Sequence, residues 1–254
     1  REDLRRSISI RLRSDVPIAF CMSGGVDSNA LISMASRENG FDVHGFTVTS
    51  PDNRYNEDDL VKKAVETLKI SHTSVPIQKQ NFLEDIKTLV NFHDCPVYTI
   101  SYFFHWKMLK AINEAGFKVS ISGTGADELF TGYYDHGNLF LKSIYDNDDN
   151  FNLALEGFNK NHLPYVRNKH LQDPFLFINN PSFRDHIYDN NKIFSKFLNK
   201  DWHESYHEKN YDVSLLRNRM LNEMFHESVP PILHEDDLNA MYFSVENRSP
   251  FLDR

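Results

Sequence analysis

The segment that most constrains this chain is a glycine loop, Ser23-Gly-Gly-Val-Asp-Ser28, between an apolar run and a helical pattern. Residues 17–22 read as a short buried strand, and apolar residues recur at helical spacing over residues 29–37. Such a loop turns backbone N–H groups and the positive end of a helix dipole toward one point, where a phosphate binds. Asp27 would repel a bare phosphate, so it predicts a Mg²⁺ ion between its carboxylate and the phosphates.

The loop has the residue types that close approach to an anion requires. Gly24 and Gly25 allow a tight turn without a Cβ in the way, and Ser23 and Ser28 add hydroxyl donors. The loop lacks the Gly-Lys-Ser/Thr of the Walker motif and the spacing of a dinucleotide fingerprint. The alternative is a Ser/Gly turn that only joins a strand to a helix.

Composition limits the classes of partner. The chain has 254 residues and a net charge of −8, so no basic excess is available to neutralise nucleic-acid phosphates. No apolar run approaches the roughly 18 residues of a membrane span, and no signal peptide is visible. Cys21 and Cys95 are too few for a disulfide framework, so we expect a reducing, cytoplasmic compartment. The chain opens on Arg1 within a helical pattern and stops at Arg254, which reads as a fragment of a longer protein.

Strands and helices alternate over the first half of the chain. Further strands are predicted at 41–49, 72–77 and 117–121, and helices at 60–68, around 82–90 and at 101–115. This alternation is typical of an α/β fold with a parallel sheet and helices on both faces. We expect right-handed crossovers and ligands at the carboxyl ends of the strands.

A second strand–glycine loop–helix junction follows the strand at 117–121. It runs Ser122-Gly-Thr-Gly-Ala-Asp-Glu-Leu-Phe-Thr-Gly-Tyr133 and again carries an acid, Asp127. Two such loops on neighbouring strand ends converge, so Asp27 and Asp127 are predicted to hold the same Mg²⁺ against a triphosphate. The alternative is a solvated Asp near a helix start.

The chain changes character after Tyr134. Clear strands disappear, and we expect a helical part from about 135 to 254 that packs on the nucleotide-binding part, about 1–134, as an added C-terminal layer. Near the end, Asp237, Glu246, Arg248 and Asp253 are dense charges in an apolar run. They form either an internal ion-pair network or a wall facing the substrate.

Three stretches together resemble the synthetase domain of the glutamine-dependent asparagine synthetases: the first loop, the second loop and Ser244-Val-Glu-Asn-Arg-Ser-Pro-Phe-Leu-Asp253. The resemblance implies an adenine nucleotide alpha-hydrolase-like fold of the N-type ATP pyrophosphatases. It implies that ATP binds with its pyrophosphate on the first loop and Mg²⁺ between Asp27 and Asp127. The implied nucleotide-binding residues are Met22, Ser23, Gly24, Gly25, Asp27, Ser28, Val48, Ser122 and Gly123. Asp237, Glu246 and Arg248 are placed on the substrate side.

The resemblance also implies a reaction. A substrate carboxylate attacks the α-phosphate of ATP, giving an acyl-adenylate and pyrophosphate, and ammonia from a glutaminase domain then releases AMP. Positioning and charge neutralisation would carry most of this catalysis. The family's N-terminal glutaminase domain and its later lysine segment are absent from this sequence. We expect no nucleic-acid or membrane partner, and a homodimer stays open.

The sequence departs from the family at a catalytic position. Thr124 lies between the glycines of the second loop, where asparagine-making members usually carry an acid, and a hydroxyl is no general base near neutral pH. Asn247 and Ser249 also differ from the usual small or apolar residues. The acid that is amidated therefore stays open between aspartate, a sugar acid and a natural-product precursor.

Other classes of function compete with this interpretation. Thr124 favours a non-catalytic ATP-binding module. The presence of both Asp27 and Asp127 argues against such a module. His203-Glu-Ser-Tyr-His207 matches the zinc-protease motif, but its polar surroundings favour a solvated helix. His93-Asp94-Cys95 has no partner pair at zinc spacing, so we expect no zinc site there. Transfer-RNA thiolation would need a reactive Cys pair or a basic surface, and neither is visible.

Overall fold

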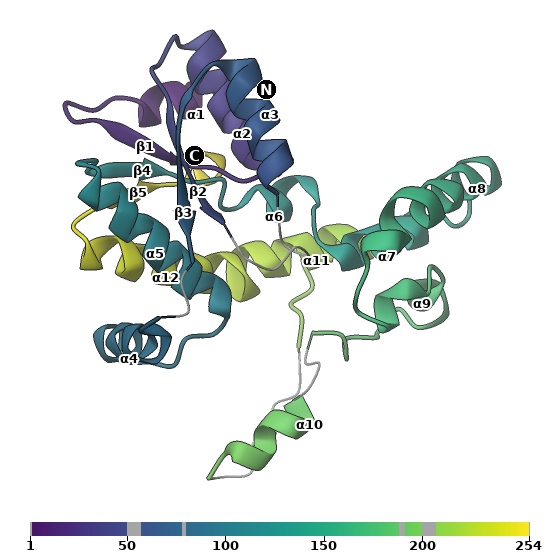
Figure 1. Ribbon diagram of the computed structural model, residues 1–254. Helices are drawn as coiled ribbons and strands as arrows, with labels where there is room; N and C mark the ends of the chain where they lie inside the picture. Colours follow the sequence, from purple (N-terminus) through teal and green to yellow (C-terminus); the bar gives the residue numbers. More distant parts are fainter. Residues whose placement is uncertain (1, 50–56, 78–79, 188–190, 200–206, 254) are drawn as a thin grey trace. The chain divides into compact units, whose positions relative to one another are not determined.

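The computed structural model describes residues 2–49, 57–77, 80–187, 191–199 and 207–253. Its contacts divide the chain into two compact units, each described by itself below (Figure 1). The sheet unit comprises Arg1–Ala126 and Val229–Arg254, and the helical unit comprises Asp127–Ser228.

A five-stranded parallel sheet forms the centre of the sheet unit, in the order β3-β2-β1-β4-β5. The strands are β1 (Ile18–Cys21), β2 (His44–Thr49), β3 (Ser71–Pro76), β4 (Val119–Ile121) and β5 (Glu246–Arg248). Ala19 of β1 pairs with His44 of β2 and Ser120 of β4. The strand order reverses between β1 and β4, which is where ligands bind in open parallel sheets. The predicted α/β fold class is confirmed.

Helices cover both faces of this sheet (Figure 1). One face packs on α5 (Ile100–Glu114) and α12 (Val229–Tyr242), and its core joins Ala19 and Phe46 to Leu109, Ile112 and Ala240. The other face carries α1 (Glu2–Arg11), α2 (Val26–Ser33) with its π-helical extension η1 (Met34–Glu38), and α3 (Asp58–Leu68). The remaining helical elements of this unit are α4 (Phe82–His93) and η8 (Pro250–Leu252), and α6 (Ala126–Phe130) begins at its last residue before the helical unit.

Local sequence explains where several of these helices begin and end. The Thr99 side chain accepts a hydrogen bond from the backbone N–H of Ser101 and so caps the start of α5. Lys69 ends α3 in the left-handed conformation, with φ 54°. The predicted elements are all present with shifted boundaries; for example, β2 starts at His44 rather than at Phe41.

β5 was not predicted from the sequence. Its residues, Glu246-Asn247-Arg248, are polar, as suits a short strand at the edge of a sheet. Val119, Ser120 and Ile121 of β4 pair with them in register. Residues 229–254 therefore belong to the sheet unit, whereas the predicted helical part runs to residue 254.

The helical unit contains only helices and loops among its described residues. Its longer helices are α7 (Tyr134–Ser143), α8 (Asp148–Gly157) and α11 (Leu215–Asn222). α7 contributes to two apolar clusters, one around Leu139 and Phe177 and one around Leu141 and Phe151. The shorter elements are η3 (Phe158–His162), η4 (Leu163–Tyr165), η5 (His170–Gln172), α9 (Leu176–Asn179), α10 (Asn191–Phe194), η6 (Ser195–Phe197) and η7 (Glu223–Glu227).

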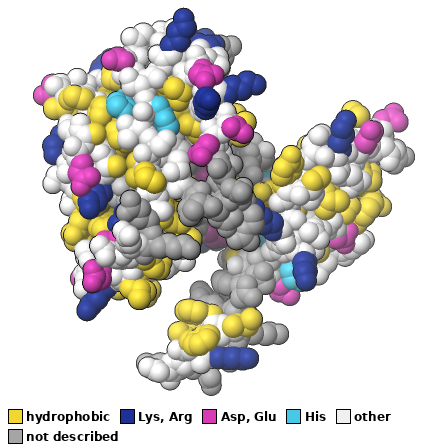
Figure 2. All heavy atoms as spheres, in the orientation of Figure 1, with side chains coloured by type: hydrophobic (Ala, Val, Ile, Leu, Met, Phe, Trp, Pro, Cys, Tyr) yellow, Lys and Arg dark blue, Asp and Glu magenta, His cyan; other side chains and the backbone are white. Residues whose placement is uncertain are grey.

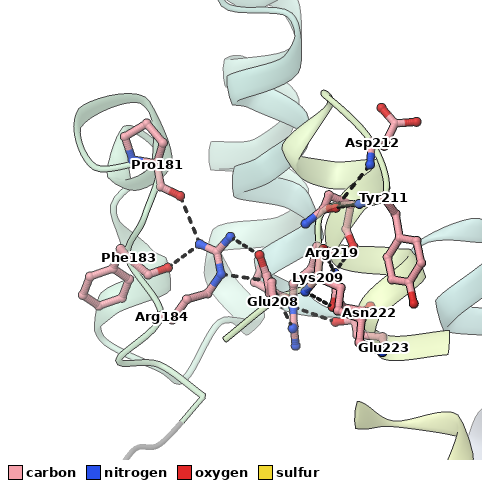
Figure 3. A network of polar contacts seen from close by, with 12 residues as sticks. Pro181, Phe183, Arg184, Glu208, Lys209, Tyr211, Asp212, Arg219, Asn222 and Glu223 are labelled. Carbon is pink, nitrogen blue, oxygen red and sulfur yellow. Dashed lines mark hydrogen bonds and ion pairs between the residues drawn. The ribbon is translucent and has the colours of Figure 1, made fainter. Parts of the chain in front are cut away.

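A buried polar network joins separate segments of the helical unit (Figure 3). Arg184 donates two hydrogen bonds to the carboxylate of Glu208, at 2.9 and 2.6 Å. Arg219 of α11 contacts Glu208 at 3.4 Å and Glu223 at 3.1 Å. Asn222 accepts a hydrogen bond from the backbone N–H of Lys209 at 2.8 Å. Since buried charges are stable only when paired, these contacts hold the loop before α11 in place.

On the face shown in Figure 2, basic and acidic side chains are interspersed over the sheet unit, with no patch of a single sign. Ile193, Phe194 and Phe197, from α10 and η6, are exposed. Among the described residues, each helix is too short or too polar to span a bilayer.

Candidate functional site

The first glycine loop turns its backbone N–H groups toward oxygen atoms. The N–H of Ser23 donates to Oγ of Ser28 at 3.1 Å, and the N–H of Gly25 donates to Oγ of Ser23 at 3.1 Å. The N–H of Gly24 donates to a carboxylate oxygen of Glu57 at 2.7 Å. Three successive donors therefore bind three oxygens, which is the arrangement of an anion-binding loop at a helix start.

Two neighbours hold this loop in shape. A Cβ built on Gly24 would lie 2.9 Å from Cβ of Leu60 in α3, so a side chain at this position would displace the loop or the helix. The Asn29 amide donates to the carbonyls of Ser23 at 3.0 Å and Gly25 at 2.7 Å. The loop is thus pre-formed by contacts within the sheet unit.

The second loop lies directly beside the first. A Cβ built on Gly123 would lie 3.5 Å from Cβ of Asp27 and 3.5 Å from the backbone nitrogen of Ser28. Gly125 has a φ of +92°, and a side chain there would overlap Leu252. The predicted convergence of the two loops is confirmed as far as Gly123 and Asp27 are concerned.

Thr124 belongs to a chain of polar contacts that reaches α12 and α5. Its hydroxyl donates to Oδ2 of Asp236 at 3.1 Å, and Nδ1 of His105 lies 2.9 Å from Oδ1 of the same carboxylate. Oγ of Ser122 lies 3.0 Å from the Thr124 hydroxyl. Because Thr124 gives its only proton to Asp236, Ser122 is the donor in that contact.

Asp236 sets the charge of this part of the site. Burial lowers the pKa of His105, but the charge and hydrogen bond of Asp236 outweigh it and raise that pKa well above its ordinary value. Burial, with the charges of Glu235 and Asp236, raises the pKa of Tyr102 to about 12, so its hydroxyl stays neutral.

A cavity of about 250 Å³ opens beside the first loop. It lies at the carboxyl ends of β1 and β2, against α5, and combines apolar side chains with polar groups. Its lining includes Met22, Ser23, Val48, Glu57, Phe104, His105 and Met108. Three of the predicted nucleotide-binding residues, Met22, Ser23 and Val48, thus line the same cavity.

Asp127 lies at the start of α6 and belongs to the helical unit. Its side chain lies against Gly132, where an added Cβ would overlap the carboxylate. Nearby, the Tyr133 hydroxyl donates to Glu128 at 2.5 Å. The shared metal of Asp27 and Asp127 stays a prediction.

The charges near the end of the chain make contacts within the sheet unit, some of them with residues far away in the sequence. Arg248 pairs with Glu246 at 2.7 Å and donates to the backbone carbonyls of Arg11 at 2.6 Å and Arg13 at 2.9 Å. These contacts favour the ion-pair alternative over a substrate-facing wall for Arg248 and Glu246. Asp237 is exposed, whereas its neighbours Glu235 and Asp236 are buried.

Sequence reasoning missed Asp236, His105 and Glu57. A signal for Asp236 existed, because on α12 the buried residues 235, 236, 239 and 240 recur at helical spacing and Asp237 does not share their face. No local signal marks His105 or Glu57, whose partners lie far away in the sequence.

Comparisons with known proteins agree with this geometry. Residues 1–254 match the family described as asparagine synthase. The glutamine-hydrolyzing asparagine synthetase 1 of Bacillus subtilis is 26% identical over 274 residues, covering 100% of this chain and 42% of that protein. A putative asparagine synthetase 2 of Methanocaldococcus jannaschii is 29% identical over 133 residues, covering 52% of this chain and 25% of that protein.

A fungal relative is named as a different kind of enzyme. The amidase chyE of Penicillium rubens is 25% identical over 147 residues, covering 52% of this chain and 22% of that protein. The chain thus spans less than half the length of each of these three relatives. Since the family match covers every residue, the chain belongs to the asparagine synthase family.

Proposed function

We propose that this chain uses ATP to activate a carboxylic acid as an acyl-adenylate and transfers the acyl group to ammonia, forming an amide. Membership of the asparagine synthase family supports an ATP-dependent amidation. The observation that carries the proposal is the contact between the two glycine loops, in which Gly123 lies against Asp27 and Ser28. This contact lies at the reversal of strand order, where nucleotides bind in such sheets.

The first loop fits a polyphosphate. The carboxylate of Glu57 on the N–H of Gly24 is an anionic acceptor in the position that a phosphate oxygen would take. We propose that the pyrophosphate part of ATP replaces it and contacts Ser23, Gly24, Gly25 and Ser28. The adenine would enter the neighbouring cavity, beside Met22 and Val48.

Asp27 fits the donor chemistry of Mg²⁺, which prefers carboxylate and phosphate oxygens. We propose that Asp27 and Asp127 hold this ion, and Asp127 follows directly on Ala126 of the second loop. When bound, Mg²⁺ supplies positive charge that offsets the charge of the phosphates. The backbone N–H groups of the first loop hold the pyrophosphate in place.

The proposed reaction has two steps. An oxygen of the substrate carboxylate attacks the α-phosphorus, and the bond from that phosphorus to pyrophosphate breaks. Ammonia then attacks the acyl carbon, the bond from that carbon to AMP breaks, and the nitrogen loses a proton. Holding the two reactants side by side accounts for much of the rate, as in other positioned bimolecular reactions.

Thr124 has a place in this scheme although it is no base. Its hydroxyl donates to Asp236, so its oxygen lone pairs can accept a hydrogen bond from the attacking nitrogen. Asp236 is thus proposed to supply the negative charge that a threonine lacks. Ser122, which donates to Thr124, fixes the orientation of that hydroxyl.

The relatives' names extend the proposal to the source of ammonia. Because they are glutamine-hydrolyzing and longer than this chain, we propose that a glutaminase domain or subunit supplies the ammonia. The two cysteines form no disulfide, which supports a reducing compartment such as the cytoplasm. The substrate acid is proposed by class only, since relatives named asparagine synthetase and amidase both match.

Isotope exchange between pyrophosphate and ATP tests the first step directly. The chain is incubated with MgATP, labelled pyrophosphate and, in turn, aspartate, a sugar acid and a panel of other carboxylic acids. Exchange that depends on one acid supports the proposal and names the substrate. ATP binding without exchange under every condition contradicts it and favours a non-catalytic ATP-binding module.

A further inference from the structure

A second group of reactive side chains lies away from the glycine loops, within the sheet unit. His93 ends α4, Cys95 follows two residues later, and Glu235 comes from α12. Nδ1 of His93 lies 2.9 Å from Oε2 of Glu235, and Sγ of Cys95 lies 3.9 Å from Oε1 of the same carboxylate. One nitrogen, one sulfur and one oxygen atom all lie within 4.8 Å of one another.

The backbone explains how two nearly adjacent residues reach one carboxylate. Asp94, between His93 and Cys95, has the left-handed conformation with φ 52° and ends α4. The chain turns there, and the side chains on both sides of Asp94 contact Glu235. Glu235 is 140 residues further on, which is why no local zinc spacing is visible in the sequence.

Two members of the group, His93 and Glu235, are buried and have polar atoms without hydrogen-bond partners, whereas Cys95 is partly exposed. The side chains of His93 and Glu235 are both 0% exposed. Their closest atoms are near each other but badly aligned for a hydrogen bond, so neither ring nitrogen of His93 nor Oε2 of Glu235 has a hydrogen-bond partner. Buried polar atoms without partners are costly and point to a missing ligand or ion.

A similar group in the helical unit has its negative charges paired with a cationic side chain. Asp135, His136 and Glu223 also lie within reach of one ion. There, however, the guanidinium of Arg219 contacts Asp135 at 3.2 Å and Glu223 at 3.1 Å, and so supplies the positive charge. Among the described residues, no Lys or Arg forms an ion pair with Glu235, so its charge is not offset in this way.

The donor set selects the kind of ion. Thiolate, imidazole and carboxylate together are typical zinc ligands, whereas Mg²⁺ and Ca²⁺ prefer oxygen atoms only. In tetrahedral zinc sites neighbouring donor atoms are about 3.3–3.6 Å apart, as the bond lengths require. The separations of 2.9 and 3.9 Å lie on either side of this range.

We propose that His93, Cys95 and Glu235 bind one Zn²⁺ ion, with a fourth position open to water. Binding converts the Cys95 thiol to a thiolate and releases its proton to the solvent. The two positive charges of the ion then equal the negative charges of Cys95 and Glu235. The ion fixes the end of α4 to α12 one residue before Asp236, which contacts Thr124 of the second loop.

The test uses the full chain, freed of any affinity tag, stripped with a chelator and then titrated with Zn²⁺ or Co²⁺. We expect one ion per chain and, with Co²⁺, the near-ultraviolet charge-transfer band that a thiolate ligand gives. Cys95→Ala should remove this band and weaken metal binding by about 100-fold or more, and Glu235→Gln should weaken it by at least about 10-fold. Cys21→Ala, which removes the other cysteine, is the control and should keep both the thiolate band and the metal affinity.

The test can also overturn the proposal. A wild-type chain that binds no Zn²⁺ after stripping, or a Co²⁺ complex without the thiolate band, would contradict it even if the variants fail to fold. Metal that persists in Cys95→Ala and is lost in His203→Ala would assign the ion to the His203–His207 motif instead. His203 and Glu204 lie outside the described residues. Because the pyrophosphate exchange needs only MgATP and an acid, a failed zinc test leaves the proposed function standing.

Discussion

At the residue scale, Asp27 is an acid placed among groups that are proposed to bind the phosphates of ATP. It lies in a loop whose N–H groups face oxygen atoms, and its Cβ is 3.5 Å from the position that a Cβ on Gly123 would take. A carboxylate beside a phosphate site is stable only if a cation lies between them. The proposed metal would thus give a physical reason for an acid at this position.

We therefore expect Asp27→Asn to lower acid-dependent pyrophosphate exchange by at least about 100-fold, because the amide cannot offer the metal a charge. Asp127→Asn should have a similar effect. Circular dichroism should show an unchanged fold in both. Asp42→Asn, at an exposed position of the same unit, is the control and should exchange normally. Near-normal exchange in either loop variant would rule out the shared metal.

Glu57 has a role of its own in this site, since its carboxylate is bound to the N–H of Gly24. A phosphate must displace it, so Glu57→Gln should bind ATP more tightly, with a dissociation constant lower by about five-fold, or roughly 1 kcal/mol. Calorimetric titration with MgATP measures this. Glu66→Gln, on the exposed side of α3, should leave the affinity unchanged. Weaker binding in Glu57→Gln would mean that Glu57 assists the nucleotide.

Sequence reasoning could find the candidate site only in part, and the reason is physical. The two glycine loops are local motifs, so Ser23–Ser28 and Ser122–Gly125 were predicted correctly as neighbours. Asp236 and Glu57 contribute through contacts made between distant segments, with Thr124 and Gly24 respectively. Such contacts depend on how helices pack on the sheet, which residue types alone do not encode.

At the element scale, the pairing of α7 with α11 in the helical unit depends on Asp135 and Arg219. Burial opposes ionisation of Asp135, but the hydrogen bond from His186 and the charge of Arg219 lower its pKa to about 2. An unfolded Asp titrates near 3.9, so the folded state holds the ionised form more strongly. This contribution is complete above about pH 5 and is lost as the pH falls toward 2.

Asp135→Asn should therefore lower the free energy of unfolding by about 2 kcal/mol at pH 7, with little loss at pH 2. Urea denaturation at both pH values measures the difference. Asp185→Asn, an exposed site in the same unit, is the control. Burial, with the charge of Asp135, raises the pKa of Glu223, which gives the opposite pH dependence, and Asp135→Asn removes the part of that shift that comes from Asp135. An equal loss of unfolding free energy at pH 2 and pH 7 would mean that the charge of Asp135 does not stabilise the fold.

The elements themselves differ in how well their sequence predicts them. β1, β2 and α5 have strong apolar patterns, because both faces of the sheet are covered, and they were predicted within a few residues. β5 has three polar residues, and only its pairing with β4 makes it a strand. An edge strand that is defined by its partner cannot be predicted from its own composition.

At the scale of the whole molecule, the sheet unit is built from two separated pieces of chain, with the helical unit inserted between them. α12 covers α5, and β5 pairs with β4, so residues 229–254 complete the core. Removing them would expose the apolar side of α5 around Leu109 and Ile112. The two apolar clusters described for the sheet unit, around Phe46 and around Phe103, contain residues of the sheet unit alone.

Two deletions should therefore behave differently. A chain that ends at residue 228 should aggregate or lack cooperative unfolding. A chain in which residues 127–228 are replaced by a flexible Gly/Ser linker should keep a cooperative thermal transition. Differential scanning calorimetry with light scattering compares the two. A soluble, cooperative chain ending at 228 would show that α12 and β5 are dispensable for the sheet unit.

The late arrival of β5 also matters during synthesis on the ribosome. β4 ends at residue 121 and its partner begins at residue 246, which is 125 residues later (246 − 121). At about 5–20 residues per second, roughly 6–25 s pass before the nascent strand can be paired on that side. Throughout that interval the backbone N–H and C=O groups on this side of β4 have no partner strand, so the nascent chain offers an open edge that can pair wrongly with another strand.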